Sequence, residues 1–318
     1  MNAVDHNNVV IFDDRGIPSI MCRFVRPKDT EEVPAVFKIG DKVADAIYIS
    51  KYPNIVIDGR AYSMPMADPT VNITFDGAVQ ACRCKGLGWH LMTAVEYEYL
   101  LNQSREKGTM PHGNTDWGKD YYHNDEQGKV SNLGRTYTGT GPVTWNHDHT
   151  PYGVSDLNGN VWEWLAGLRI KDGVIEFIPD NKAASPYCDL SKDSAEWQQA
   201  ETSKGPVRAN VECGEITITD AVAADDYEPD YDGVRIEKLE VELSEIPQVL
   251  KDLGIIPDKR AEEEGKTYVY FDATEGEYMP VRGSAFDFTS SSGPSALGLD
   301  DPRSARTTAL VSAPLFMR

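Results

Sequence analysis

The chain has 318 residues, of which 40% are hydrophobic and 26% are charged, and its formal net charge is −20 at pH 7. This hydrophobic content is enough to fill a core, and the length fits one large domain with an additional segment. The acidic balance argues against nucleic acid as a partner, since nucleic-acid binding needs a basic surface. No run of 18 apolar residues is present, so we expect no membrane insertion.

The first eight residues lack the basic and apolar regions of a signal peptide. The five cysteines are few and odd in number, which favours reduced thiols in a protein made in a cytosol.

Residues 1–60 form an N-terminal segment in which short apolar runs alternate with turn residues. Runs at 9–12, 18–25 and 45–50 predict strands, and a further extended run at 53–59 leads into the next part of the chain. We therefore expect a β-rich segment over 1–60 and a main domain over 61–318.

Two helix starts follow. Thr74 is a candidate N-cap for a helix that ends at Lys85-Gly86, and Thr93 begins a second helix with Glu96 at the capping-box position. Residues 108–151 are rich in Gly, Asn, Asp and Thr without periodicity, which predicts long ordered loops.

The segment from Tyr152 to Trp164 has an unusual order. Four turn-forming residues at 156 and 158–160 are followed at once by Val161-Trp-Glu-Trp164, whose period of two places both tryptophans on one face of a strand. We expect both indoles to be buried. The strand should continue to Ile170, and Lys171-Asp-Gly173 should turn into a second strand at 174–178.

An acidic insertion at about 180–275 interrupts this pattern. It contains a strand-like run at 215–219 and a helical run near 245–253, and we expect its charges on solvated loops and faces. Strand-like runs at 267–271 and 278–282 then resume the core.

The run Gly159-Asn-Val-Trp-Glu-Trp164 resembles the signature of the formylglycine-generating-enzyme-like branch of the C-type-lectin-type fold. The layout of residues 78–96 is similar to the two-helix start of such domains. The resemblance implies an α+β protein in which two helices pack on short antiparallel sheets with long ordered loops.

Enzymes of that branch oxidise a substrate cysteine with two cysteines that follow an Arg-Gly-Gly-Ser motif. This chain has Arg282-Gly-Ser284 but no cysteine beyond Cys213, so it lacks the thiolates that copper binding or disulfide exchange would need. The clustered pair His147-Asp-His149 lies in a polar loop, where we expect it to face solvent rather than hold a metal. We therefore expect no catalytic residue and no cofactor.

The C-terminal segment, residues 282–316, has a biased composition. It contains no Glu, Lys, Gln, Met or Trp, although these types supply 58 of the 318 residues and about six would be expected there by composition. Aromatic and aliphatic residues are interleaved among small polar ones, unlike a flexible tail.

This segment resembles the variable repeat of diversity-generating retroelement target proteins. Their pattern corresponds to Arg282-Gly-Ser-Ala-Phe286, Ser295-Ala-Leu-Gly-Leu299 and Pro302-Arg-Ser304. In that family, mutagenic copying randomises adenines in Asn-type codons, which cannot then encode the five missing residue types. The second Gly and the Trp of the family motif are replaced near Ala285 and Phe286, and the closing motif is replaced by residues 311–318.

The resemblance implies a non-catalytic binding protein of the phage or prophage type, made in the bacterial cytoplasm and carried on the virion tail. Its partner would be a host-surface protein or glycan, with other tail proteins and further copies of the chain as additional partners. Arg282, Leu297, Leu299 and Pro302 would point inward or hold the backbone. The outward, ligand-binding residues would be Phe286, Asp287, Phe288, Ser290, Ser291, Asp300, Asp301, Ala305 and Thr307.

Two functional alternatives stay open, namely a diverged oxidase of the same branch and a structural protein of the same fold. A second open question concerns Asp156 and Asn158, which supply oxygen ligands of the kind calcium favours. Relatives carry structural calcium near this motif. A turn closed by Asx hydrogen bonds needs no ion, and we favour that interpretation.

Overall fold

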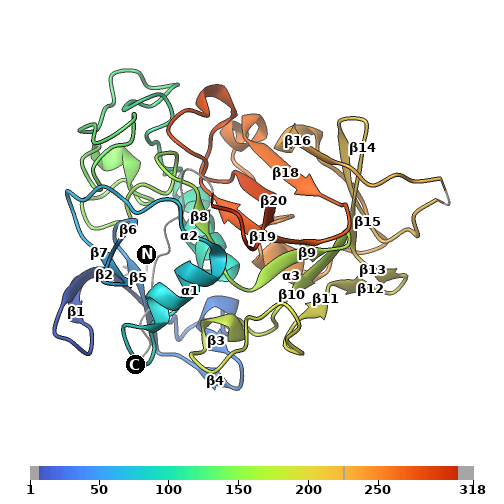
Figure 1. The fold of residues 1–318 in the computed structure, drawn as a ribbon, viewed down its shortest axis with the longest axis horizontal. Coiled ribbons are helices and arrows are strands. Elements are labelled where there is room, and N and C mark those ends of the chain that lie inside the picture. The colour runs from blue at the N-terminus through green and yellow to red at the C-terminus, as the bar shows by residue number, and fades with distance from the viewer. Residues whose placement is uncertain (1–6, 225, 307–318) are drawn as a thin grey trace.

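The structure, a computed structural model, describes residues 7–224 and 226–306 (Figure 1). Helices α1 (Phe75–Arg83) and α2 (Ala94–Lys107) lie beside sheets whose strands are mostly antiparallel, and a short helix α3 (Gln248–Asp252) follows later. The predicted α+β class is confirmed. In the described ranges, every helix is too short or too polar to cross a bilayer.

The N-terminal part builds a three-stranded antiparallel sheet in the order β1 (Asn7–Phe12), β2 (Pro18–Val25) and β5 (Ala46–Ser50). Phe24 and Ile47 of this sheet belong to the same hydrophobic core as Leu100 of α2. Strands β6 (Asn54–Ile57) and β7 (Arg60–Ser63) form a hairpin that spans residue 60, where we expected the N-terminal segment to end. That domain boundary stays a prediction.

Both helices begin where the sequence predicted. The Thr74 hydroxyl accepts a hydrogen bond from the backbone N–H of Gly77, and Thr93 and Glu96 form a complete capping box. Helix α2 ends at Lys107 and is capped by Gly108, whose φ of 66° lies in the left-handed region that closes helices.

The main sheet has eleven strands among the described residues. Its order is β16-β18-β20-β19-β9-β10-β14-β15-β17, with β11 paired to β10 and β8 paired to β19. The central strands are β19 (Glu277–Arg282), β9 (Leu168–Lys171) and β10 (Val174–Phe177), and β9 and β10 form the hairpin expected at 171–173.

The acidic insertion contributes to both ends of this sheet. Strands β14 (Arg208–Glu212), β15 (Glu215–Thr219) and β17 (Glu240–Glu242) extend it beyond β10. Strands β16 (Tyr231–Arg235) and β18 (Tyr268–Asp272) extend it beyond β20 (Leu297–Pro302). Adding strands satisfies the backbone groups that a sheet edge leaves unpaired. The insertion is thus continuous with the sheet that carries the C-terminal segment (Figure 1).

The tryptophan motif occupies the junction of helices and sheet. Trp162 and Trp164 are buried, as predicted, in one hydrophobic cluster with Phe75 and Val281. The strand itself is only two residues long, β8 (Glu163–Trp164). The Leu165 N–H still donates to the Pro280 oxygen of β19, but Ala166 forms its backbone hydrogen bonds with Met92 and Ala94 before the chain rejoins the sheet as β9.

The remaining elements are short. The other paired strands are β3 (Lys38–Ile39), β4 (Lys42–Val43), β11 (Gln198–Gln199), β12 (Glu201–Thr202) and β13 (Gly205–Pro206). Single 3-10 turns lie at η1 (Ala35–Phe37), η2 (Val143–Trp145), η3 (Lys182–Ala184), η4 (Ile236–Lys238), η5 (Glu262–Lys266) and η6 (Thr289–Ser291).

Residues 108–151 form the ordered loops that the sequence predicted. Asn160 holds them, since its side-chain oxygen accepts from the Thr136 N–H at 2.8 Å and from the Asn114 amide at 3.0 Å. Gly159 makes this approach feasible, because a Cβ there would lie 2.0 Å from the backbone oxygen of Asn114.

Candidate ligand-binding face

The C-terminal segment stands on a buried scaffold. Arg282, Leu297 and Leu299 are at most 2% exposed, as predicted. The Arg282 guanidinium donates to the backbone oxygens of Leu253 and Gly254 at 3.0 and 2.9 Å, which ties the segment to the end of α3. Pro302 is exposed and lies opposite Tyr278 at the end of β20, so it is part of the strand pairing and does not pack in the core.

The segment also depends on a buried charge network. Arg105 of α2 forms ion pairs with Glu98 and with Glu264 of η5, and the Ser295 hydroxyl donates to Glu264. Burial raises the pKa of Glu98, whereas the hydrogen bonds and charge of Arg105 overcome burial and lower the pKa of Glu264. Although we expected the insertion's charges in solvent, Glu264 is an exception, because it compensates Arg105 inside the protein.

The predicted outward residues differ in exposure. Asp287 is exposed, and the partly buried ones are Phe288, Ser290, Ser291, Asp300, Asp301 and Ala305. The prediction was wrong for Phe286, which is 7% exposed. Its ring packs edge-to-face on Trp117 at 4.9 Å between ring centroids. Thr307 lies outside the described residues.

Strand register creates an aromatic face that we did not predict. In β18, Val269 and Phe271 are buried, so alternation places Tyr268 and Tyr270 on the other side of the sheet. The two tyrosine rings stack at 5.9 Å, and Phe288 lies edge-on to Tyr270 at 6.4 Å. We call Tyr268, Tyr270 and Phe288 the aromatic face. The sequence feature from which this face could have been predicted is the period of two at residues 267–271.

A glycine leaves room for this face. Gly233 in β16 and Gly298 in β20 lie opposite Tyr270 on either side of it. A Cβ on Gly233 would lie 2.3 Å from the Tyr270 ring, so that ring lies across the neighbouring strand. The Tyr270 ring fills the space that a side chain at Gly233 would occupy.

Asp300 adds an acidic group beside the aromatic face. Burial, and then the neighbouring charge of Asp301, raises the pKa of Asp300 to about 6. Burial alone raises the pKa of Asp301 to about 6. Burial and the charge of Asp300 together raise the pKa of Tyr270 to about 12. The phenol of Tyr270 is therefore a hydrogen-bonding group and not an ionised one at neutral pH.

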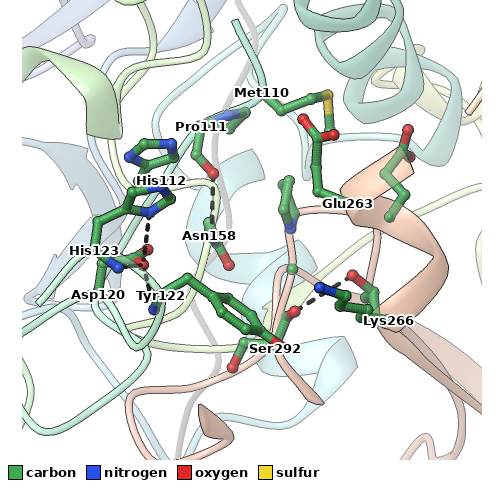
Figure 2. A pocket seen from close by; sticks show the side chains of 14 residues that line it. Met110, Pro111, His112, Asp120, Tyr122, His123, Asn158, Glu263, Lys266 and Ser292 are labelled. Atoms are coloured by element: carbon green, nitrogen blue, oxygen red, sulfur yellow. Dashed lines mark hydrogen bonds and ion pairs between the residues drawn. The ribbon is translucent and has the colours of Figure 1, made fainter. Parts of the chain in front are cut away.

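A cavity of about 340 Å³ adjoins the other side of η6 (Figure 2). Its walls come from the loop between Met110 and His123, from the end of η5 and from Ser292–Pro294. The Tyr122 hydroxyl donates to the backbone oxygen of Ser290 at 3.2 Å, which joins the cavity wall to the predicted binding segment.

Asp120 organises the loop side of this cavity. Its carboxylate accepts from the backbone N–H groups of Gly113, Tyr122 and His123, and it contacts the His123 ring nitrogen at 3.0 Å. The rings of His112 and His123 stack at 3.6 Å between centroids. Sequence reasoning missed these residues because they lie in aperiodic loops.

The turn at residues 156–160 also differs in detail from the prediction. The Asp156 carboxylate accepts from the Gly139 N–H at 2.8 Å rather than from its own turn, and the Asn158 amide donates to the Pro111 oxygen at 3.1 Å. Burial raises the pKa of Asp156 to about 6. Across residues 7–224 and 226–306, no three His, Cys, Asp or Glu side chains are grouped as a metal site would require.

The cysteines and the His-X-His pair contribute no reactive group to this face. None of the five cysteines, all of which lie in the described part of the chain, forms a disulfide, and of Cys82 and Cys84 only Cys82 is buried. His147 is buried, contrary to the prediction, because its Nδ1 accepts from the backbone N–H of Val154 at 2.8 Å.

Comparisons with known proteins give a partial match. Residues 51–208 match the FGE-sulfatase family, described as the Sulfatase-modifying factor enzyme 1-like domain. The chain is 36% identical over 105 residues to a mouse (Mus musculus) protein named formylglycine-generating enzyme. That alignment covers 31% of this chain and 27% of the mouse protein, so the chain spans about a quarter of that relative.

Among solved structures, the chain is similar to the Major Tropism Determinant I1 and P3c variants. Each similarity has a TM-score of 0.34 and 10% sequence identity, and covers 98% of this chain and 71% of the other. At these values the likeness is distant.

Proposed function

We propose that this chain is a non-catalytic ligand-binding protein that recognises a host-surface protein or glycan through its C-terminal segment. The binding surface comprises the aromatic face with Asp287, Ser290, Ser291 and Asp300. In this proposal the protein is a variable protein of the phage or prophage type, located on the virion tail beside other tail proteins or further copies of itself.

One observation carries the proposal. Asp287 of the segment is exposed and Phe288, Ser290, Ser291 and Asp300 are partly exposed, whereas the scaffold residues Arg282, Leu297 and Leu299 are buried. Side chains at such a surface can change without loss of the core, because they contribute little to stability. The composition of the segment, limited to residue types that mutagenic copying can produce, supports the same reading.

The chemistry of the surface also supports binding. Tyrosine and phenylalanine offer rigid contact area that loses little conformational entropy, while serine and aspartate offer adaptable hydrogen bonds. Phe288 is held edge-on between Tyr270 and Trp162, so this anchor is already ordered in the free protein. An ordered anchor lowers the entropic cost of binding.

The alternative function is a diverged oxidase, which the match of residues 51–208 to the enzyme-containing family favours. Arg282-Gly-Ser284 has no cysteine after it, and Gly283 and Ser284 are buried. Incubation with copper and a cysteine-containing sulfatase peptide tests this alternative, because conversion of the peptide cysteine to an aldehyde would establish an enzyme.

The proposal is tested by binding of the fluorescently labelled chain to a panel of bacterial cells. The test variant combines Asp287→Ala, Ser290→Ala and Ser291→Ala. The control combines Asp193→Ala, Ser191→Ala and Ser203→Ala, which removes the same residue types from the exposed segment near β11 and β12.

We expect the test variant to lose about tenfold or more in affinity for a responsive strain, with unchanged melting. The control variant should bind like the parent. Equal binding by both variants, or the absence of any responsive strain, would contradict the proposal. Protease or periodate treatment of the cells then separates a protein receptor from a glycan.

A further inference from the structure

Three paired strands place a row of polar side chains beside the aromatic face. Residues that lie opposite each other on paired strands project from the same face of a sheet. The pairing of β16 with β18 sets Tyr231 opposite Asp272. In the parallel pairing of β18 with β20, Phe271 lies opposite Leu299, which brings Asp300 level with Asp272. We call Tyr231, Asp272 and Asp300 the acidic row.

The acidic row and the aromatic face form one accessible surface. Tyr231 is 66% exposed, and the other two members of the row and all three members of the aromatic face are partly exposed. Tyr270 lies two positions before the row on β18 and opposite Gly298. A Cβ on Gly298 would lie 2.9 Å from Oδ1 of Asp300. The Asp300 carboxylate therefore extends toward the level of Tyr270.

Asp300 has no positive charge to compensate it within residues 7–224 and 226–306. The neighbouring charges that act on it are those of Asp301 and Asp272, which are both negative. Because burial raises its pKa only to about 6, the carboxylate is still ionised at neutral pH. By contrast, Glu277 of the neighbouring strand β19 pairs with Arg303. The acidic row thus carries a partly buried charge that a ligand can compensate.

Arg235 of β16 does not supply this compensation. It lies opposite Tyr268, four positions before Asp272 on β18. Four residues of a strand span roughly 13 Å. The Arg235 guanidinium lies 4.0 Å from Glu237 on its own side of the sheet edge. It therefore marks the opposite end of the surface from the acidic row.

This composition favours a cationic ligand. A neutral ligand that covered Asp300 would deepen the burial of an unpaired charge, which costs free energy, and an anion would be repelled. The faces of aromatic rings carry negative potential and attract cations. A guanidinium fits better than an ammonium, because it is planar, stacks on tyrosine and donates two parallel hydrogen bonds to one carboxylate.

We propose that the acidic row and the aromatic face bind an arginine side chain of a protein receptor. The guanidinium would stack on Tyr270 and donate to the Asp300 carboxylate, and Tyr231 and Phe288 would border the aliphatic stem. This inference rests on the proposed receptor-binding function and names a protein with an exposed arginine as the receptor. The net charge of −20 adds long-range attraction for a basic partner.

The test is calorimetric titration of the full chain with Nα-acetyl-arginine methylamide. Two matched probes are the citrulline analogue, which has the same shape without the charge, and the lysine analogue, which has the charge without the planar group. We expect the arginine probe to bind with a dissociation constant on the order of 1 mM, and each matched probe to bind about tenfold more weakly.

Variants locate the binding. Asp300→Asn and Tyr270→Leu should each weaken binding of the arginine probe about tenfold, because one removes the carboxylate charge and the other removes the ring. Tyr270→Phe keeps the ring and should bind within about twofold of the parent. Asp193→Asn removes one negative charge from an exposed position elsewhere, so it controls for net charge and should bind like the parent.

Thermal melting of each variant separates lost recognition from lost folding. If Tyr270→Leu melts below the assay temperature, Asp300→Asn alone decides the outcome, because it removes an unpaired charge without removing packed atoms. The inference is overturned if the arginine probe does not bind, if either matched probe binds as tightly, or if Asp300→Asn binds as tightly as the parent.

The cell-binding assay distinguishes this inference from the proposed function. Cell binding that depends on Asp287, Ser290 and Ser291 but survives Asp300→Asn would overturn the arginine site and leave receptor binding intact. Binding of the arginine probe that Asp300→Asn weakens, without binding to any strain, would support the arginine site and contradict receptor binding. Loss of cell binding after periodate but not after protease would overturn the protein receptor. Competition between the arginine probe and cells would support both proposals.

Discussion

Replacing Trp162 by alanine tests whether the tryptophan motif supports the aromatic face. Trp162 is 8% exposed, and its indole lies edge-on to Phe288 at 5.2 Å and to Tyr270 at 6.4 Å. Truncation of a buried aromatic residue costs about 3–5 kcal/mol of unfolding free energy. Each lost aromatic pair is worth about 0.5–1.5 kcal/mol beyond buried area. We therefore expect a loss near the upper end, about 4–5 kcal/mol.

Urea denaturation measures this loss. Trp162→Ala should lower the midpoint with an unchanged slope, since the surface exposed on unfolding stays nearly constant. Tyr187→Ala is the control and should change stability by less than about 0.5 kcal/mol, because that side chain is exposed. A double-mutant cycle with Phe288→Ala should show coupling of about 0.5–1.5 kcal/mol. A loss below about 1 kcal/mol, or no coupling, would refute the reasoning.

Three further predictions concern single sites. Phe286→Ala should destabilise the protein by about 3 kcal/mol in thermal melting, because the ring is buried against Trp117; an unchanged melting temperature would place the ring outside. Asp300→Asn should be about 1–2 kcal/mol more stable than the parent at pH 7. The raised pKa of Asp300, about 6, means that the parent loses stability as pH rises from about 4 to 6, so the two proteins should converge near pH 4 in denaturant titrations. Excess chelator should leave melting unchanged, because the Asp156 carboxylate already accepts from Gly139; a large drop would establish a structural calcium ion.

Features that depend on neighbouring residues could be predicted from the sequence. The N-cap at Thr74 and the capping box at Thr93 involve side chains within three positions of the groups they bind. The hairpin at 171–173 follows from turn residues between two apolar runs. Burial of Trp162 and Trp164 follows from their size and spacing.

The binding segment contains both positions that could be predicted from the sequence and one contact that could not. Its scaffold was predicted correctly at Arg282, Leu297 and Leu299, since these positions match a known pattern. Phe286 was predicted to face outward, because no residue near it in the sequence indicates that it packs against Trp117. The contact joins residues 169 positions apart and follows from how the loop at 108–151 lies against the sheet.

The sequence by itself determined the helix starts, the buried tryptophans and the biased composition of residues 282–316, because each of these lies in local order or in residue type, and its resemblance to a known family implied the α+β class. Tertiary structure alone decided which side chains meet. It placed Tyr268 and Tyr270 of the insertion beside Phe288, and it brought Asn158 and Ser292 to one cavity. The register of β18 against β20 and the packing of aperiodic loops arise from long-range pairing, which no pattern within a short window encodes.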